Sequence, residues 1–155
     1  MKVGIASDHA GYNKKEKLIK YLKKKKYEVI DYGTNSTTSV DYPDYAKKLC
    51  NGIKNNEIEL GILICYTGIG MSIAANKIDG IRCAKVDNVK EAMLCRLHNN
   101  SNVIALSARK CMFELKDILD KFLKTNFSNE ERHIRRVNKL VDYDKNEIEM
   151  PKVNG

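Results

Sequence analysis

Short apolar segments rich in β-branched residues alternate with helix-like segments along almost the whole chain, and this alternation constrains the fold most strongly. The predicted strands are residues 3–7, 27–32, 60–65, 81–86 and 102–107. Helices are predicted near residues 13–26, 43–55, 70–77, 88–98, 111–124 and 129–140. Near-continuous apolar strands separated by helices are typical of a parallel sheet covered by helices on both faces. We therefore predict a three-layer α/β/α, Rossmann-like fold whose five-stranded parallel sheet has flavodoxin-like order.

The length and composition fit one globular domain. The chain has 155 residues, of which 43% are hydrophobic and 31% are charged. The periodic pattern ends near residue 140, so we expect one domain over residues 1–140 and a C-terminal tail or extension over residues 141–155. The first apolar stretch is too short for a signal peptide, and no run approaches the ~20 apolar residues of a membrane span. We expect a cytoplasmic protein with no membrane partner.

The net charge of +8 raises the question of an anionic partner. No basic stripe is interleaved with aromatic residues, so we expect no nucleic-acid partner. Three of the six arginines lie in residues 131–137. Arg132 and Arg136, at positions i and i+4, share a helix face and could bind a phosphate, whereas Arg135 points elsewhere.

The five cysteines show no C-x-x-C spacing, and we expect free thiols. Cys95 and His98 are three residues apart, as two metal ligands on one helical turn could be. A structural zinc site needs four such groups, and no second pair is visible. We therefore predict no metal site.

Ligands of parallel α/β sheets bind at the carboxyl ends of the strands. That rule selects three segments, which are residues 7–11 (SDHAG), residues 65–72 (CYTGIGMS) and residues 107–109. In the second segment, a glycine turn leads into a helix whose first N–H groups can hold an anion. Cys65 faces this helix start and could act as a base, but a packed strand-end thiol is an equally good interpretation of its spacing.

The three histidines favour the functional interpretation. His9 follows the first predicted strand, His98 ends a helix, and His133 lies within the arginine cluster. A single histidine in a polar segment is usually solvated or a capping residue. Three at candidate ligand-facing positions favour a site.

Several separate motifs, in matching order from residue 2 to about residue 140, resemble one family. They are SDHAG (7–11), DYGT (31–34), VDYPDYA (40–46), ILICYTGIGMSIAANKIDGIR (62–82), HNNSNVIALSAR (98–109) and ERHIRRV (131–137). These segments resemble the family of ribose-5-phosphate isomerase B, which also holds the galactose- and allose-type sugar-phosphate isomerases. The resemblance implies that residues 1–140 are a single sugar-phosphate isomerase domain. It also implies interconversion of ribose 5-phosphate and ribulose 5-phosphate in the non-oxidative pentose phosphate pathway, through an enediolate and without metal or cofactor.

The resemblance also implies roles for individual residues. Cys65 would carry a proton between C1 and C2, His98 would be the acid that opens the ring, and Asp8 and Thr67 would lie near the sugar hydroxyls. The implied substrate-binding residues are Asp8, His9, Tyr42, Tyr66, Thr67, Gly68, Ile69, Gly70, Asn99, Arg109, Arg132 and Arg136. Members of the family are homodimers or homotetramers with shared sites, so His98, Asn99 and Arg109 are expected to serve a partner's Cys65.

Two departures keep alternatives open. Tyr66 stands where the family usually has glycine, and residues 98–100 read HNN in place of H-N-D. The alternatives are an isomerase for a six-carbon sugar phosphate, such as allose 6-phosphate or galactose 6-phosphate, and a sugar-phosphate-binding protein without catalysis.

Overall fold

The predicted strands form one parallel sheet in a computed structural model of the chain, which describes residues 1–144. The strands are β1 (Lys2–Ser7), β2 (Glu28–Asp31), β3 (Leu60–Cys65), β4 (Cys83–Lys85) and β5 (Val103–Ser107). Every pair of neighbours is parallel, and the order is β2-β1-β3-β5-β4. The predicted α/β class and the five-stranded parallel sheet are confirmed.

The strand order differs from the flavodoxin-like order in its last two positions. That order is 2-1-3-4-5, whereas β5 lies next to β3 here and β4 forms the edge. All five residues of β5 are buried, but β4 has three residues of intermediate exposure. A strand that is apolar on both faces is stabilised at the centre of a sheet, and a short, partly exposed strand is tolerated at the edge.

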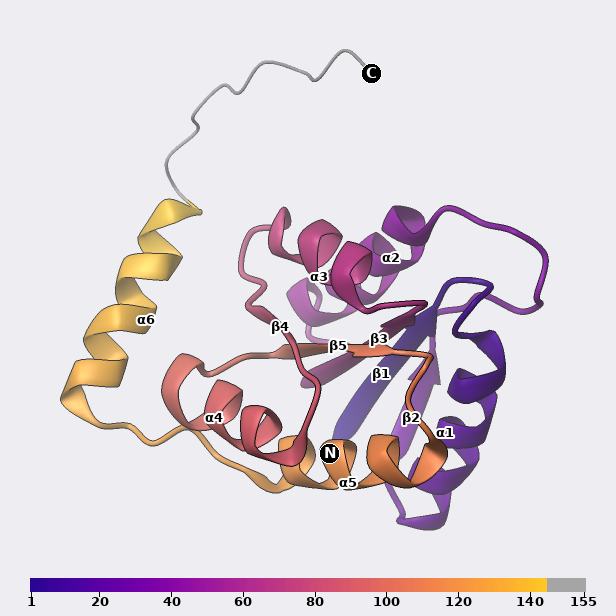
Figure 1. Cartoon of the computed structure of the whole chain (residues 1–155). Helices are drawn as coiled ribbons and strands as arrows, with labels where there is room; N and C mark the ends of the chain where they lie inside the picture. The colour runs from indigo at the N-terminus through magenta and orange to yellow at the C-terminus, as the bar shows by residue number, and fades with distance from the viewer. Residues whose placement is uncertain (145–155) are drawn as a thin grey trace.

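Six helices accompany the sheet within the described residues. They are α1 (Tyr12–Lys24), α2 (Tyr42–Lys54), α3 (Ile69–Asn76), α4 (Val89–Asn99), α5 (Met112–Lys124) and α6 (Glu131–Tyr143). Figure 1 shows α2 and α3 on one face of the sheet and α1, α4 and α5 on the other. The strands alternate in the same way: Ile62 and Ile64 pack with α1, α4 and α5, whereas Leu63 and Cys65 pack with α2 and α3. Cys65 therefore lies on the α2–α3 side of the sheet.

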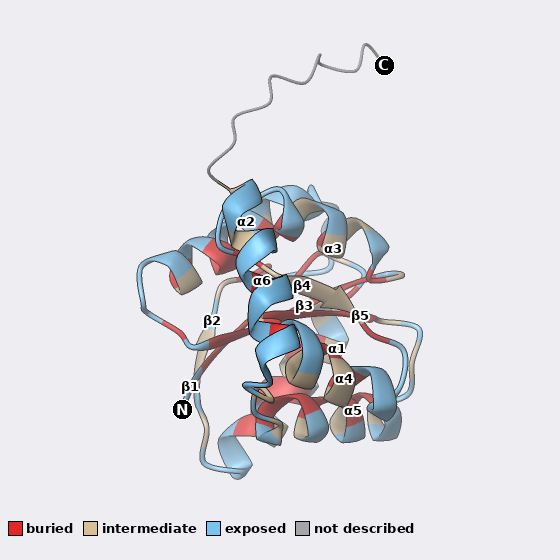
Figure 2. Cartoon of the chain, turned by 90° about the vertical axis from the view of Figure 1, so that its left-hand side faces the viewer, coloured by how far each residue is buried: buried red, intermediate tan, exposed pale blue. Residues whose placement is uncertain are grey.

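The last helix, α6, lies outside the three layers and next to α4 (Figures 1 and 2). Most of its surface is exposed, and its buried residues are His133 and Val137. The helix continues to Tyr143, so the predicted boundary at residue 140 falls inside it. Residues 145–155 of the predicted tail lie outside the described residues. No helix within residues 1–144 is long and apolar enough to cross a membrane.

Candidate active site

The carboxyl end of β1 carries a buried carboxylate. Asp8 is 7% exposed, and its Oδ1 accepts a hydrogen bond of 3.0 Å from the backbone N–H of Gly11. The N–H of Asp8 donates to the carbonyl oxygen of Ile64, which holds the residue against the end of β3. The next residue, His9, accepts at Nδ1 from the N–H of Val40, 3.2 Å away. These bonds join the end of β1 to the end of β3 and to the segment before α2.

The thiol of Cys65 lies at the carboxyl end of β3 and is 5% exposed. Its Sγ accepts a hydrogen bond of 3.2 Å from the N–H of Gly68. Gly68 has φ +81°, and a Cβ there would lie 3.0 Å from the carbonyl carbon of Leu106. Only glycine satisfies both conditions without strain. The turn thus directs a backbone dipole at the sulfur, and an N–H donated to sulfur stabilises negative charge on it.

The start of α3 lies beside this thiol. Thr67 Oγ1 accepts from the N–H of Ile69 at 3.2 Å, which fixes the entry into the helix. N–H groups in the first turn of a helix have no intrahelical acceptor and can bind an anionic oxygen. Tyr42, the first residue of α2, covers Gly70 so closely that a Cβ there would lie 2.9 Å from the tyrosine ring. Tyr42, which the resemblance implies as a substrate-binding residue, is therefore a neighbour of this loop.

A single hydroxyl joins the end of β5 to this loop. Ser107 Oγ donates to the carbonyl oxygen of Tyr66 at 2.8 Å and accepts from the N–H of Arg109 at 3.2 Å. The Tyr66 ring is exposed, and the Arg109 guanidinium lies over it, 5.5 Å from the ring centroid. Arg109 therefore lies beside the loop of its own chain. Ser107 is not among the predicted site residues, although its position at the end of β5 is a signal for it.

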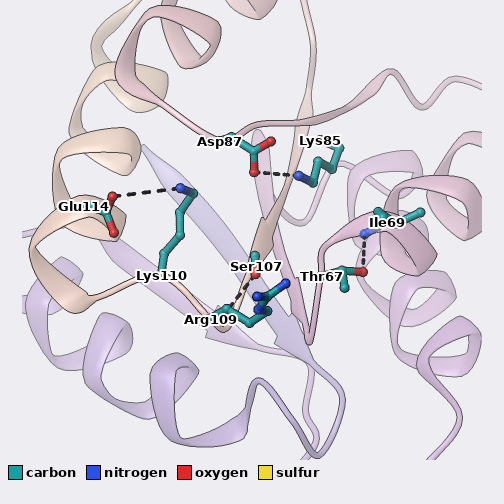
Figure 3. Close-up of a pocket in the computed structure, with 8 residues that line it drawn as sticks. All are labelled: Thr67, Ile69, Lys85, Asp87, Ser107, Arg109, Lys110 and Glu114. Carbon is teal, nitrogen blue, oxygen red and sulfur yellow. Dashed lines mark hydrogen bonds and ion pairs between the residues drawn. The ribbon is translucent and has the colours of Figure 1, made fainter.

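A hollow of about 420 Å³ opens beside Thr67 and Arg109 (Figure 3). Its lining residues are Thr67, Ile69, Lys85, Asp87, Ser107, Arg109, Lys110 and Glu114. Two of its three cations are paired with carboxylates, since Lys85 lies 2.5 Å from Asp87 and Lys110 lies 4.0 Å from Glu114. The hollow thus joins the carboxyl ends of β3, β4 and β5.

The predicted acid, His98, is far from this edge within one chain. His98 and Asn99 end α4, which runs from the carboxyl end of β4 back to the amino end of β5. Both residues are exposed. Cys65 lies at the opposite end of the same sheet. One chain alone therefore does not bring His98 and Asn99 to Cys65.

The two arginines predicted to bind phosphate, Arg132 and Arg136, also lie away from Cys65 within one chain. Arg132 and Arg136 are exposed on α6, and Arg132 Nε donates to Glu130 Oε2 at 3.0 Å. Because α6 packs against α4, these arginines lie on the side of the molecule that carries His98. The predicted residues thus form two groups, one around Cys65 and one on α4 and α6.

His133, which the sequence marks as a candidate but to which it assigns no role, lies between α6 and His98 of α4. It is 4% exposed, and its ring centroid lies 4.5 Å from that of His98. Its Nδ1 shares a hydrogen bond of 2.6 Å with Ser128 Oγ. Burial lowers the pKa of His133, and the charges of His98 and Arg132 lower it further. Its place within the arginine cluster of residues 131–137 is the signal for it.

Two other buried cysteines, Cys50 and Cys95, lie within the hydrophobic core. Burial raises the pKa of Cys50 to about 12 and that of Cys95 to about 11. Both thiols therefore stay neutral near pH 7 and act as packing residues. Across residues 1–144, no three His, Cys, Asp or Glu side chains are arranged as metal ligands.

A parallel α/β sheet that gathers a thiol, a carboxylate and a glycine-rich helix start at its carboxyl edge is typical of enzymes that bind small ligands there. The sequence profile of the Ribose/Galactose Isomerase family matches residues 3–140. The chain belongs to this family of isomerases.

Curated and solved proteins agree with that assignment. A putative sugar phosphate isomerase of Rickettsia bellii is 49% identical over 135 residues, which cover 84% of this chain and 92% of the relative. The solved ribose-5-phosphate isomerase B of Clostridium thermocellum superimposes with a TM-score of 0.91 at 46% identity, covering 94% of this chain and 98% of the other. The enzyme of Mycoplasma genitalium, solved with bound ribulose-5-phosphate, has a TM-score of 0.87 at 43% identity, covering 93% and 96%.

Proposed function

We propose that this isomerase acts on sugar phosphates and interconverts ribose 5-phosphate and ribulose 5-phosphate through an enediolate. Family membership and the names of the similar proteins support the substrate class. The observation that carries the mechanism is the buried Cys65 thiol, whose sulfur accepts the N–H of Gly68 within a glycine turn. This turn provides a proton acceptor and backbone donors in one place.

In the proposed reaction, Cys65 removes the proton from C2 of the open-chain aldose and returns it to C1. Negative charge develops on the oxygens of the enediolate during this transfer. The backbone N–H groups in the first turn of α3 are already oriented by the helix, so they stabilise that charge without reorganisation. One such donor contributes roughly 2.7–4 kcal/mol in well-studied oxyanion holes. Asp8 and Thr67 lie at the same edge of the sheet, and in this proposal they bind the sugar hydroxyls.

The proposal requires a second copy of the chain, as a homodimer or within a homotetramer. His98, which we propose as the ring-opening acid, lies at the opposite end of the sheet from Cys65 of its own chain. Helix α6 exposes apolar side chains, which include Ile134, Leu140 and Tyr143. These side chains support an interface with a second copy of the chain near His98. In such an assembly, α4 and α6 of one copy supply His98, Asn99, Arg132 and Arg136 to the Cys65 loop of the other.

Steady-state kinetics of the purified chain with three substrates test the proposal. Ribose 5-phosphate, allose 6-phosphate and galactose 6-phosphate are compared at equal enzyme concentration, with ketose formation as the readout. We expect the highest kcat/KM with ribose 5-phosphate. A higher kcat/KM with either six-carbon phosphate would contradict the proposed substrate, and binding of all three without turnover would contradict the proposed reaction.

A further inference from the structure

Tyr66 is a bulky, exposed side chain directly after the buried Cys65. Tyr66 is 61% exposed, although hydrogen bonds fix the backbone around it. The carbonyl oxygen of Cys65 accepts from the N–H of Ala108 at 2.9 Å, and that of Tyr66 accepts from Ser107 Oγ at 2.8 Å. The main chain therefore holds the ring at the rim of the site.

The backbone of Arg109 is held by the same hydroxyl, that of Ser107. Its N–H donates to the Ser107 hydroxyl that also binds the Tyr66 carbonyl, so one oxygen sets the separation of the two residues. The guanidinium lies 5.5 Å from the centroid of the Tyr66 ring, within the range of a cation–π contact. In Figure 3 the Arg109 side chain points toward Thr67 and away from Glu114.

Among residues 1–144, Arg109 is the cation of the hollow that is not paired with a carboxylate. Lys85 is paired with Asp87, and Lys110 is paired with Glu114. Within residues 1–144, Arg109 has no carboxylate within ion-pair distance. A contact with the face of an aromatic ring leaves the N–H groups at the edge of a guanidinium free to bind an anionic oxygen.

We propose that Tyr66 is a positioning residue whose ring holds the Arg109 guanidinium over the hollow, where it binds an anionic oxygen of the substrate. This inference rests on the proposed function, because it takes the anion to be that of a sugar phosphate. Tyr66 acts through Arg109 and does not itself contact the sugar.

A double-mutant cycle tests the coupling, with the dissociation constant of ribulose 5-phosphate measured by calorimetry and KM and kcat measured in parallel. Tyr66→Leu removes the ring face, and we expect about three- to tenfold weaker binding and an equal rise in KM with little change in kcat. Tyr66→Phe keeps the ring face and should bind within about twofold of wild type. In an Arg109→Gln background, Tyr66→Leu should cause no further loss.

Phe113→Leu is the matched control, because Phe113 is an aromatic side chain that is 74% exposed at the start of α5. It should bind ribulose 5-phosphate as the wild type does. Two results would overturn the positioning role: wild-type affinity for ribulose 5-phosphate in Tyr66→Leu, or an equal loss of affinity from Tyr66→Leu in the wild-type and Arg109→Gln backgrounds. Neither result would contradict the proposed isomerase activity. If the wild-type chain binds neither ribulose 5-phosphate nor inorganic phosphate, the proposed function and this inference both fail.

Discussion

Single residues at the end of β3 determine what the proposed site can do. Gly68 combines φ +81° with a close approach to Leu106, and its N–H reaches the sulfur of Cys65. A side chain at this position would move the donor away from the thiol. The chemistry of Cys65 therefore depends on a neighbour that has no side chain.

Gly68→Ala should lower both stability and turnover. A left-handed conformation costs a residue with a Cβ about 1–2 kcal/mol, and the contact with Leu106 adds to this. Gly80→Ala is the matched control, because Gly80 has φ +82° and nothing within 4 Å of an added Cβ. Urea unfolding and kcat of both variants check this. A Gly80→Ala variant that loses as much stability and turnover as Gly68→Ala would contradict the role assigned to the contact.

Some residues of the candidate site were predictable from the sequence, and others were not. The glycines, Cys65 and Asp8 were predictable, because they interrupt the pattern at the ends of apolar strands. The hydrogen bonds by which Ser107 joins Tyr66 to Arg109 were not predictable, because they depend on the pairing of β5 with β3. The same holds for Lys15, whose buried amine lies 2.8 Å from a carboxylate oxygen of Asp31. A lysine in a basic helix is ordinarily solvated, and this pairing requires α1 to pack beside β2.

Among the elements, α6 is the one whose orientation decides most about the proposed site. Its buried residues are His133 and Val137, at positions i and i+4. Arg136 directly precedes Val137, whereas Arg135 lies two residues from each buried position and so about 200° around the helix. Arg135 is therefore on the face opposite to α4.

Arg136→Ala should raise KM for ribose 5-phosphate by about ten- to hundredfold, with a smaller effect on kcat. The reason is that a guanidinium bound to phosphate forms a charge-assisted hydrogen bond worth roughly 1.5–3 kcal/mol. Arg135→Ala, on the other face, is the control and should change KM much less. Kinetics that rank Arg135 as the costlier loss would show that the helix face has been assigned wrongly.

The α4–α6 contact should depend on pH through His133. Its folded-state pKa lies below the ordinary value of 6.5, so the unfolded chain binds the proton more readily. The stabilising contribution is therefore complete above pH 6.5 and is lost as the pH falls below it. Urea midpoints at pH 7.5 and 5.5 should differ less in His133→Gln than in wild type. Equal differences in the two proteins would contradict the assigned protonation.

Helices and strands were largely predictable from the sequence, but their arrangement was only partly so. Alternating apolar segments gave five strands and six helices, and the class of fold followed. The predicted order had β4 next to β3, whereas β5 occupies that position. The central position goes to the strand that is buried on both faces. In the sequence, only the polar residues Arg82 and Lys85 indicate that the fourth strand is the more exposed one. His98 was predicted among the candidate ligand-facing positions, but α4 precedes β5 and so ends at the amino edge of the sheet.

At the scale of the whole molecule, the two groups of candidate residues lie at opposite ends of one sheet. The Cys65 loop is at the carboxyl edge, and His98 is at the end of α4. The proposed proton acceptor Cys65 and the proposed acid His98 can serve a single sugar only if two copies of the chain meet. The assembly is thus part of the proposed mechanism.

Mixing two inactive variants tests the shared site. In the proposed homodimer, the Cys65→Ala and His98→Asn variants should each have little activity when assembled alone. After exchange of subunits at equal concentration, half of the dimers are mixed, and each holds one intact site, so about a quarter of wild-type activity should return. Two Cys65→Ala preparations mixed in the same way are the control. Absence of recovery despite proven subunit exchange would contradict a site shared between chains.

The most direct test of the central claim is the rate of ribose 5-phosphate isomerisation by the Cys65→Ala variant. Cys83→Ala is the control, because Cys83 packs on the same side of the sheet and burial raises the pKa of its thiol. Loss of a general base typically costs about 10²- to 10⁴-fold, so Cys65→Ala should lose at least about a hundredfold in kcat while it still binds ribulose 5-phosphate. Cys83→Ala should keep most of its activity. A Cys65→Ala enzyme with near-wild-type kcat would contradict the account.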